Sequence, residues 1–192
     1  MSDTVMVAYQ GTRDVVPVSP TTPLPVKSVI DQTTPGTTDR VTVGGSDVID
    51  VLPTLYAAGA VSDGVVLFNP IAITNAARTS GGLLGLQSIE VLDEDDLGLA
   101  FDLIFMDASS NLGTLGSAPN ITDANARKII GRVSIATGDY YDLGASRFAS
   151  VHNVGLMMKS LAGRDIYVAG IARGAGTYTA NGLRLKFGVA QD

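Results

Sequence analysis

The sequence contains no cysteine and no tryptophan among its 192 residues. The absence of cysteine excludes disulfides, thiolate zinc sites and cysteine nucleophiles. No apolar run reaches the roughly 20 residues that a membrane-spanning helix needs. The first four residues, Met-Ser-Asp-Thr, also lack the basic and apolar regions of a signal peptide. We therefore expect a soluble protein that is made in a cytoplasm and stabilised by packing, hydrogen bonds and oligomerisation.

Charge is scarce and mostly negative. Charged residues make up 17% of the chain, and 13 basic against 19 acidic residues give a formal net charge of −6. Apart from Arg127 and Lys128, the basic residues are scattered singly. Nucleic-acid-binding proteins usually carry a basic patch, and anionic membranes attract basic segments. We therefore expect neither a nucleic acid nor a membrane as a partner.

Apolar residues and glycine are abundant. Hydrophobic residues account for 45% of the chain, which excludes disorder of the whole molecule. The mean hydropathy of +0.27 exceeds what a 19.8 kDa monomer needs and predicts a buried interface with other subunits. The 22 glycines suit many turns between short strands.

Residues 1–39 differ from the rest of the chain. Four of the eight prolines lie between Pro17 and Pro25. Proline fixes φ and removes a backbone donor, so this stretch excludes a central strand or a helix and predicts an extended, polyproline-II-like arm. The arm is either a disordered spacer or a segment that lies on a neighbouring subunit. The candidate partner-binding residues are Val15, Val16, Val18, Leu24, Val26 and Val29.

Residues 40–192 predict one all-β domain. Short apolar segments separated by Gly, Asn and Asp indicate a β-sandwich or jelly roll. In 99–106 and 183–187, apolar residues alternate, which predicts strands with one buried and one wet face. Strand edges near 64–68 and 183–189 are candidates for pairing with another subunit. The predicted strands are 40–43, 64–68, 87–92, 99–106, 131–136, 148–151, 154–159, 165–172 and 183–189.

At most one short helix is expected. Thr122 or Asp123 can cap a turn or two that runs to Ile130. Long helices between the strands are missing from the pattern, which argues against a Rossmann or other doubly wound fold.

Residues with catalytic or metal-binding chemistry are few. His152 is the single histidine, and no nucleophile elbow accompanies it. The run Asp93-Glu94-Asp95-Asp96 lacks the spacing of a calcium loop, so it predicts a solvated hairpin loop or, less simply, a weak cation site or a contact for a basic partner. The glycine-rich segments 81–85 and 170–176 do not match phosphate-binding motifs and predict hairpin and bulge glycines. We predict no catalytic, cofactor-binding or metal-binding residue, and no cofactor.

Residues 55–192 resemble a group of tailed-phage virion proteins described as head decoration (cement) or minor capsid proteins. The resemblance rests on four segments: Tyr56-Ala57-Ala58-Gly59, Ser80-Gly81-Gly82-Leu83-Leu84, 102–109 (DLIFMDAS) and 171–179 (IARGAGTYT). It implies a sandwich or jelly-roll protein on the outer surface of a phage capsid, assembled in the host cytoplasm. The implied partners are the major capsid protein and further copies of the chain, as a dimer or trimer.

Two alternatives remain open at this point. A phage tail or baseplate protein of the same fold would form rings or fibres instead of binding heads. A carbohydrate-binding module or hydrolase would use acidic residues such as Asp93, Asp95 or Asp139 together with Tyr140 and Tyr141.

Overall fold

The computed structural model describes residues 5–7, 16–18 and 45–191. The chain divides into two units, Met1–Thr42 and Val43–Asp192, and each is described by itself. In the first unit, β1 (Val5–Val7) pairs antiparallel with β2 (Val16–Val18), with Met6 opposite Pro17. Proline is tolerated there because both strands of a two-stranded sheet are edge strands.

The predicted arm residues are only partly covered by this description. Val16 and Val18 lie in β2, where the sequence predicted polyproline-II geometry. The candidate partner-binding residues Val15, Leu24, Val26 and Val29 lie outside the described residues, as does the predicted strand 40–43. Their role in contacts between subunits therefore stays a prediction.

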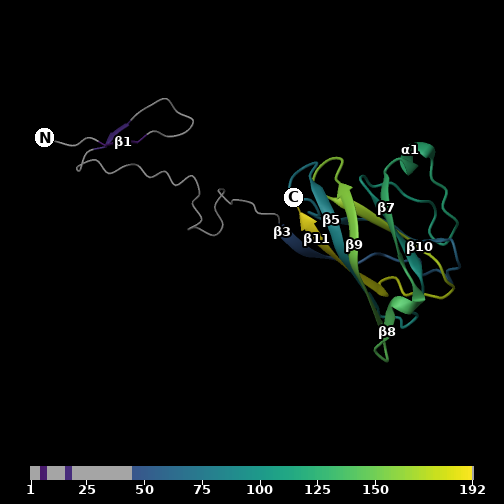
Figure 1. Ribbon diagram of the computed structural model, residues 1–192. Helices are drawn as coiled ribbons and strands as arrows, with labels where there is room; N and C mark the ends of the chain where they lie inside the picture. The colour runs from purple at the N-terminus through teal and green to yellow at the C-terminus, as the bar shows by residue number, and fades with distance from the viewer. Residues whose placement is uncertain (1–4, 8–15, 19–44, 192) are drawn as a thin grey trace. The chain divides into compact units, whose positions relative to one another are not determined.

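The second unit consists of two antiparallel sheets (Figure 1). One has the order β4-β10-β6-β7 and the other the order β3-β11-β5-β9-β8. The strands are β3 (Gly45–Val51), β4 (Val66–Ile73), β5 (Leu83–Asp93), β6 (Phe101–Met106), β7 (Ile129–Ile135), β8 (Tyr140–Asp142), β9 (Arg147–Lys159), β10 (Ile166–Ala172) and β11 (Leu183–Gln191).

The strand order defines a jelly roll. β3 pairs with β11, β4 with β10, β5 with β9 and β6 with β7, so the chain forms a long antiparallel ribbon of nested pairs. Successive pairs of this ribbon belong to alternate sheets, which is how a jelly roll wraps two sheets around one core. The all-β prediction, with a sandwich or jelly roll, is confirmed.

The core lies between the sheets, and β11 shows how the sequence builds it. Leu183, Leu185, Phe187 and Val189 are buried, while the basic residues between them are exposed. The Phe187 ring meets the ring of Phe105 edge to face, with centroids 5.9 Å apart. The predicted wet face of β11 is therefore confirmed.

The predicted wet face of β6 is wrong. All six residues of β6 are buried. Ile104 and Met106, on the face opposite the main core, pack in a second cluster with Leu112 and, from β10, Ala169. The long connection between β6 and β7 therefore covers the outer face of this strand. Alternation within one strand cannot reveal this cover, because it comes from residues further along the chain.

Two further differences concern β3 and β9. The sequence did not predict β3, since glycine, serine and two aspartates weaken its strand signal. The predicted strands 148–151 and 154–159 form one strand, β9. A bulge interrupts its pairing with β5, and Asn153 and Gly155 take positive φ values of 57° and 66° there.

The sheet edges also differ from the prediction. β11 lies between β3 and β5, so residues 183–189 form no edge. β4 does lie at an edge, but Val66 exchanges backbone hydrogen bonds with Gly116 and Ser117. On β3, the Val48 N–H donates to its neighbour's carboxylate, Asp47 Oδ1, at 2.8 Å. Such cover protects edge strands from pairing with other chains.

The expected helix is present but shorter. α1 (Asp123–Ala126) begins after Thr122, whose Oγ1 accepts a hydrogen bond from the Asn125 N–H. It ends before the predicted Ile130 because β7 begins at Ile129 and pairs with β6. A single 3₁₀ turn, η1 (Thr137–Asp139), is the other helical element of the described ranges. None of the helices in these ranges is long and apolar enough to cross a membrane.

Candidate docking surface

The connections between strands gather at two ends of the sandwich. One end, which we call the acidic end, is formed by segments 52–65, 94–100, 136–146 and 173–182. Glu94 N donates to Gly182 O there, and Arg173 N donates to Ala100 O. We call the other end the entry end because β3 begins there at Gly45. Toward it lie segments 74–82, 107–128 and 160–165. Gly81 N donates to Gly163 O at this end.

At the acidic end, Asp93 organises the connection from β5 to β6. Its side chain is buried and accepts backbone hydrogen bonds from Asp95 at 3.0 Å, Leu97 at 3.1 Å and Gly98 at 2.7 Å. Burial raises the pKa of Asp93, whereas the three N–H donors act in the opposite direction. The carboxylate therefore holds the chain in the path that leads from one sheet to the other.

The other three carboxylates of the acidic run also have partners within the domain. Glu94 pairs with Arg184 at 2.6 Å, and Asp96 pairs with Arg147 at 3.0 Å. Asp95 accepts hydrogen bonds from the backbone N–H and the hydroxyl of Thr179, at 2.7 and 3.0 Å.

The prediction of a solvated hairpin loop at residues 93–96 is consequently wrong. β5 and β6 belong to different sheets. Instead of turning a hairpin, the run is tied to β9 through Arg147, to β11 through Arg184 and to the β10–β11 connection through Thr179. Across the part of the chain that the structure describes, no cluster of three or more His, Asp or Glu side chains is arranged to hold a metal ion.

Two residues of the hydrolase alternative are held by hydrogen bonds to the backbone. Asp139 accepts a hydrogen bond from the Ala136 N–H at 2.7 Å, and the Tyr140 hydroxyl donates to Leu99 O at 3.2 Å. Burial raises the pKa of Tyr140, so its hydroxyl stays protonated at neutral pH. Tyr141 is 71% exposed. None of these residues lines the three hollows described below.

His152 lies exposed on β9. Its Nε2 is 2.9 Å from Ser150 Oγ, two residues earlier on the same face of the strand. Within the described ranges, no carboxylate accepts a hydrogen bond from this imidazole. The pair therefore lacks the orienting acid of a catalytic triad.

Asp102 is a second buried carboxylate, and its pKa shift leads to a testable prediction. It accepts hydrogen bonds from Ser134 Oγ at 2.6 Å and from Arg173 Nε at 2.8 Å. Burial alone raises the pKa of Asp102, but these bonds and the charges of Arg173 and Arg132 outweigh it, so the pKa lies below the ordinary 3.8. An acid whose pKa is lowered by folding stabilises the native state above its unfolded pKa.

We therefore expect wild-type protein to be more stable than Asp102→Asn above pH 3.8. The difference should shrink as the pH falls below 3.8 and through the folded pKa, where Asp102 becomes protonated in both states. Urea denaturation of both proteins across this range measures the effect. A stability difference that does not change with pH would contradict it.

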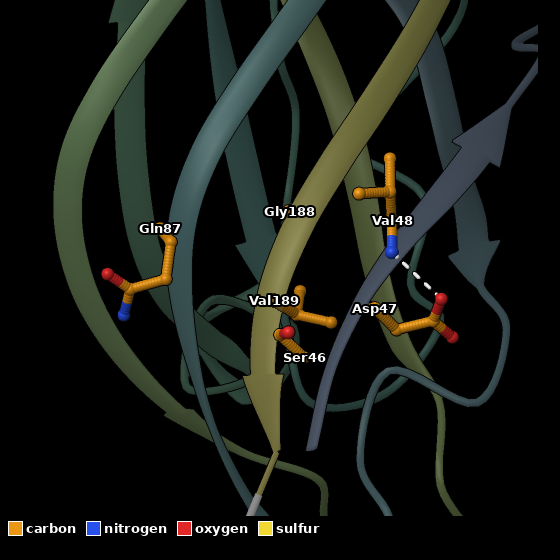
Figure 2. A pocket seen from close by; sticks show the side chains of 6 residues that line it. All are labelled: Ser46, Asp47, Val48, Gln87, Gly188 and Val189. Carbon is orange, nitrogen blue, oxygen red and sulfur yellow. Dashed lines mark hydrogen bonds between the residues drawn. The ribbon is translucent and has the colours of Figure 1, made fainter. Parts of the chain in front are cut away.

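Three shallow hollows lie toward the entry end. The first, of about 400 Å³, opens on the five-stranded sheet, where Gly188 of β11 leaves a gap between Val48 on β3 and Gln87 on β5 (Figure 2). The second, of about 260 Å³, shares Gln87 with the first and is lined by Leu83, Gly85 and Met157 among others. Val48 is 62% exposed and Met157 is 65% exposed.

The third hollow, of about 340 Å³, lies where β9 approaches β7. It shares Met157 with the second hollow and is also lined by Leu161, which is 66% exposed, and by Asp107 at the end of β6. The three hollows therefore adjoin one another through shared residues. We call this band, from Val48 across Gln87 and Met157 to Leu161 and Asp107, the docking surface.

The sequence analysis did not predict any residue of the docking surface. Val48, Gln87 and Met157 lie on three separate strands, and strand register brings them to adjoining hollows. Leu161 follows Met157 just beyond the end of β9. The one available signal was the high overall apolar content, which indicated an interface without locating it.

Comparison with known proteins yields little similarity. No protein-family model and no curated protein matches the chain. One solved structure, from Desmodium yellow mottle tymovirus, aligns over 99% of this chain and 95% of its own, with 9% identity and a TM-score of 0.27. A TM-score this low does not establish a common fold, and no argument below depends on it.

Proposed function

We propose that this chain is a non-enzymatic virion structural protein that binds the outer surface of a phage head and stabilises the joints between major capsid subunits. The observation that carries the proposal is the set of three adjoining hollows toward the entry end of the jelly roll. The acidic run is tied to internal partners, whereas exposed apolar side chains and small residues surround adjoining hollows at the entry end.

Such a surface suits binding to a protein more than chemistry. Val48, Met157 and Leu161 are exposed apolar side chains. Covering such side chains with another protein removes apolar surface from water and so favours binding. A stable interface buries roughly 800 Å² on each partner. Jelly rolls are used by viral capsid proteins but also by lectins and cupins, so the fold by itself does not decide the function.

The role proposed for the chain is mechanical. Each copy would bury apolar surface across a joint between capsid subunits and so resist the outward pressure of packaged DNA. The N-terminal arm, including Val15 to Val29, would add contacts to a neighbouring subunit, and the chain would act as a dimer or trimer. The net charge of −6 suits a place outside the DNA-filled space.

The decisive experiment mixes the purified full chain with phage heads stripped of accessory proteins and images them by cryo-electron microscopy. Regular density on the outer shell is the expected result. Bare shells, with the protein forming rings or fibres, would reject head binding and favour a tail or baseplate protein. Deleting residues 1–30 should weaken attachment while the jelly roll stays folded.

One substitution tests the docking surface itself. Met157→Glu places a charge between the second and third hollows, and burying an unpaired carboxylate is costly, so we expect at least a tenfold loss of affinity for heads. The matched control is Leu143→Glu, since Leu143 is 56% exposed and lies at the acidic end. Equal loss of binding in both variants would contradict the assignment of this surface.

A further inference from the structure

The outer face of the five-stranded sheet carries three charges in one row across its strands. Lys186 of β11 lies directly opposite Asp50 of β3 on one side and Glu90 of β5 on the other. Asp50 and Lys186 are exposed and Glu90 is half-buried. Among the ion pairs within 4.0 Å in the described part of the chain, none includes any of these three side chains. Their charges are therefore open to a partner outside the domain.

The strand period places all three side chains on the face that points away from the core. Leu185 and Phe187, on either side of Lys186 in β11, are buried between the two sheets. Ile89 and Val91 are likewise buried on either side of Glu90 in β5. Successive side chains of a strand point to opposite faces, so the charged row stands on the outer face.

The next row toward the entry end is low at its centre. Gly188 of β11 lies opposite Ser88 of β5, and a Cβ atom at Gly188 would collide with the Ser88 hydroxyl. Figure 2 shows Gly188 between Val48 and Gln87, where the first hollow opens. Two small residues on the central strands allow another flat surface to come close to the charged row.

This arrangement is complementary to a second copy of itself. In a two-fold dimer each contact occurs twice, because residue i of one copy meets residue j of the other and j meets i. A two-fold axis that runs along the strands, midway between β11 and β5, exchanges these neighbouring strands. It places Lys186 of each copy opposite Glu90 of the other, and Gly188 opposite Ser88.

The charges also select this axis over the alternative. A two-fold axis at right angles to the strands, through the charged row, would place each strand opposite its own copy. Lys186 would then face Lys186, and Glu90 would face Glu90. Like charges brought together across an interface are unfavourable, so the axis along the strands is preferred.

We propose that two copies of this chain pair face to face through their five-stranded sheets, with Lys186 of each copy paired to Glu90 of the other. This inference rests on the proposed function, because it names the partner that covers the first hollow of the docking surface. The second and third hollows, which share Met157, stay open for the head.

The size of the contact predicts a weak dimer. Neighbouring strands lie about 4.8 Å apart and residues of one face about 7 Å apart along a strand, so three rows on five strands cover roughly 500 Å². A stable interface buries roughly 800 Å² on each partner. We therefore expect a dimer that dissociates on dilution and that weakens as salt screens its charges.

Charge reversal tests the pairing in the full chain. Wild-type protein should show a monomer–dimer equilibrium in sedimentation velocity at low salt, at concentrations up to about 1 mM. Lys186→Glu and Glu90→Lys each place like charges opposite one another twice, so each should weaken dimerisation about tenfold. Asp123→Lys is the matched control, since it reverses an exposed carboxylate on α1, and it should dimerise like the wild type.

Mixing the two reversed variants gives a result that a folding defect cannot imitate. The Lys186→Glu chain carries two acidic residues at these positions, and the Glu90→Lys chain carries two lysines. Together they should form a heterodimer in which both contacts join opposite charges, although each alone is largely monomeric. One chain that carries both substitutions should regain the homodimer for the same reason.

Three results would overturn the proposal. A wild-type protein that stays monomeric up to the highest concentration, or that forms trimers, would reject the two-fold dimer. Dimerisation unchanged by either reversal would show that another face makes the contact. Loss of the dimer in both single variants, without recovery in the mixture or in the double variant, would reject the Lys186–Glu90 pair.

The two proposals can fail separately. Heads that bind a wild-type protein which is monomeric at every concentration would leave the proposed function intact and reject the dimer. A dimer that follows the expected pattern of loss and recovery, in a protein that binds no heads, would retain the sheet contact and reject head decoration.

Discussion

Replacing Asp93 with alanine is expected to lower the free energy of unfolding by about 3–5 kcal/mol. The substitution removes a buried carboxylate that accepts three backbone hydrogen bonds, from Asp95, Leu97 and Gly98. Buried N–H groups without an acceptor lose their hydration without compensation. Urea denaturation followed by circular dichroism measures the loss.

Two companion variants test the cause of this loss. Asp93→Asn keeps the shape but has one acceptor oxygen instead of two, so its loss should be smaller than that of the alanine variant. Asp50→Ala removes an exposed carboxylate of β3 and should change stability by no more than about 0.5 kcal/mol. An Asp93→Ala protein as stable as Asp50→Ala would contradict the structural role given to the acidic run.

Gly170→Ala is expected to cost about 1–3 kcal/mol through overpacking. Gly170 lies inside β10, and a Cβ atom built there would collide with the ring of Phe68, which is buried in the core. The pairing of β10 with β4 shifts register on both sides of this glycine. Chemical denaturation of the variant and the wild type measures the difference.

The matched control for Gly170 is Gly138→Ala. A Cβ at Gly138 would meet nothing within 4 Å, so this substitution should be close to neutral. Combining Gly170→Ala with Phe68→Leu should cost less than the sum of the two single changes, because the smaller side chain makes room for the new methyl group. Strict additivity would show that the Phe68 ring is not what excludes a side chain at residue 170.

Local patterns predicted much of the fold. The alternation in residues 183–187 identified β11 and its buried face, and Thr122 marked the start of α1. The bulge expected among glycines 170–176 is present at Gly170. These features depend on neighbouring residues in the chain, which is the range over which side-chain period and capping act.

Features that depend on distant residues could not be predicted. The β6 strand has the alternation of a half-exposed strand, but Leu112 and its neighbours cover its outer face. The acidic run has the composition of a solvated loop, but Arg147, Thr179 and Arg184 reach it from strands and loops 51 to 90 residues away. Those partners become neighbours only after the two sheets have formed.

The amino-acid sequence by itself determined the class of this protein: an all-β domain without disulfides, thiolate chemistry or a basic surface, preceded by a proline-rich segment. Composition and local periodicity suffice for these conclusions, because they concern which residues are present and how they alternate. The tertiary structure alone decided that β11 is central, that Asp93 fastens one end of the jelly roll, and that Asp107 faces a hollow beside Met157 and Leu161. The physical reason is that strand order and register place residues from separate segments side by side, and the sequence carries no local record of those pairings.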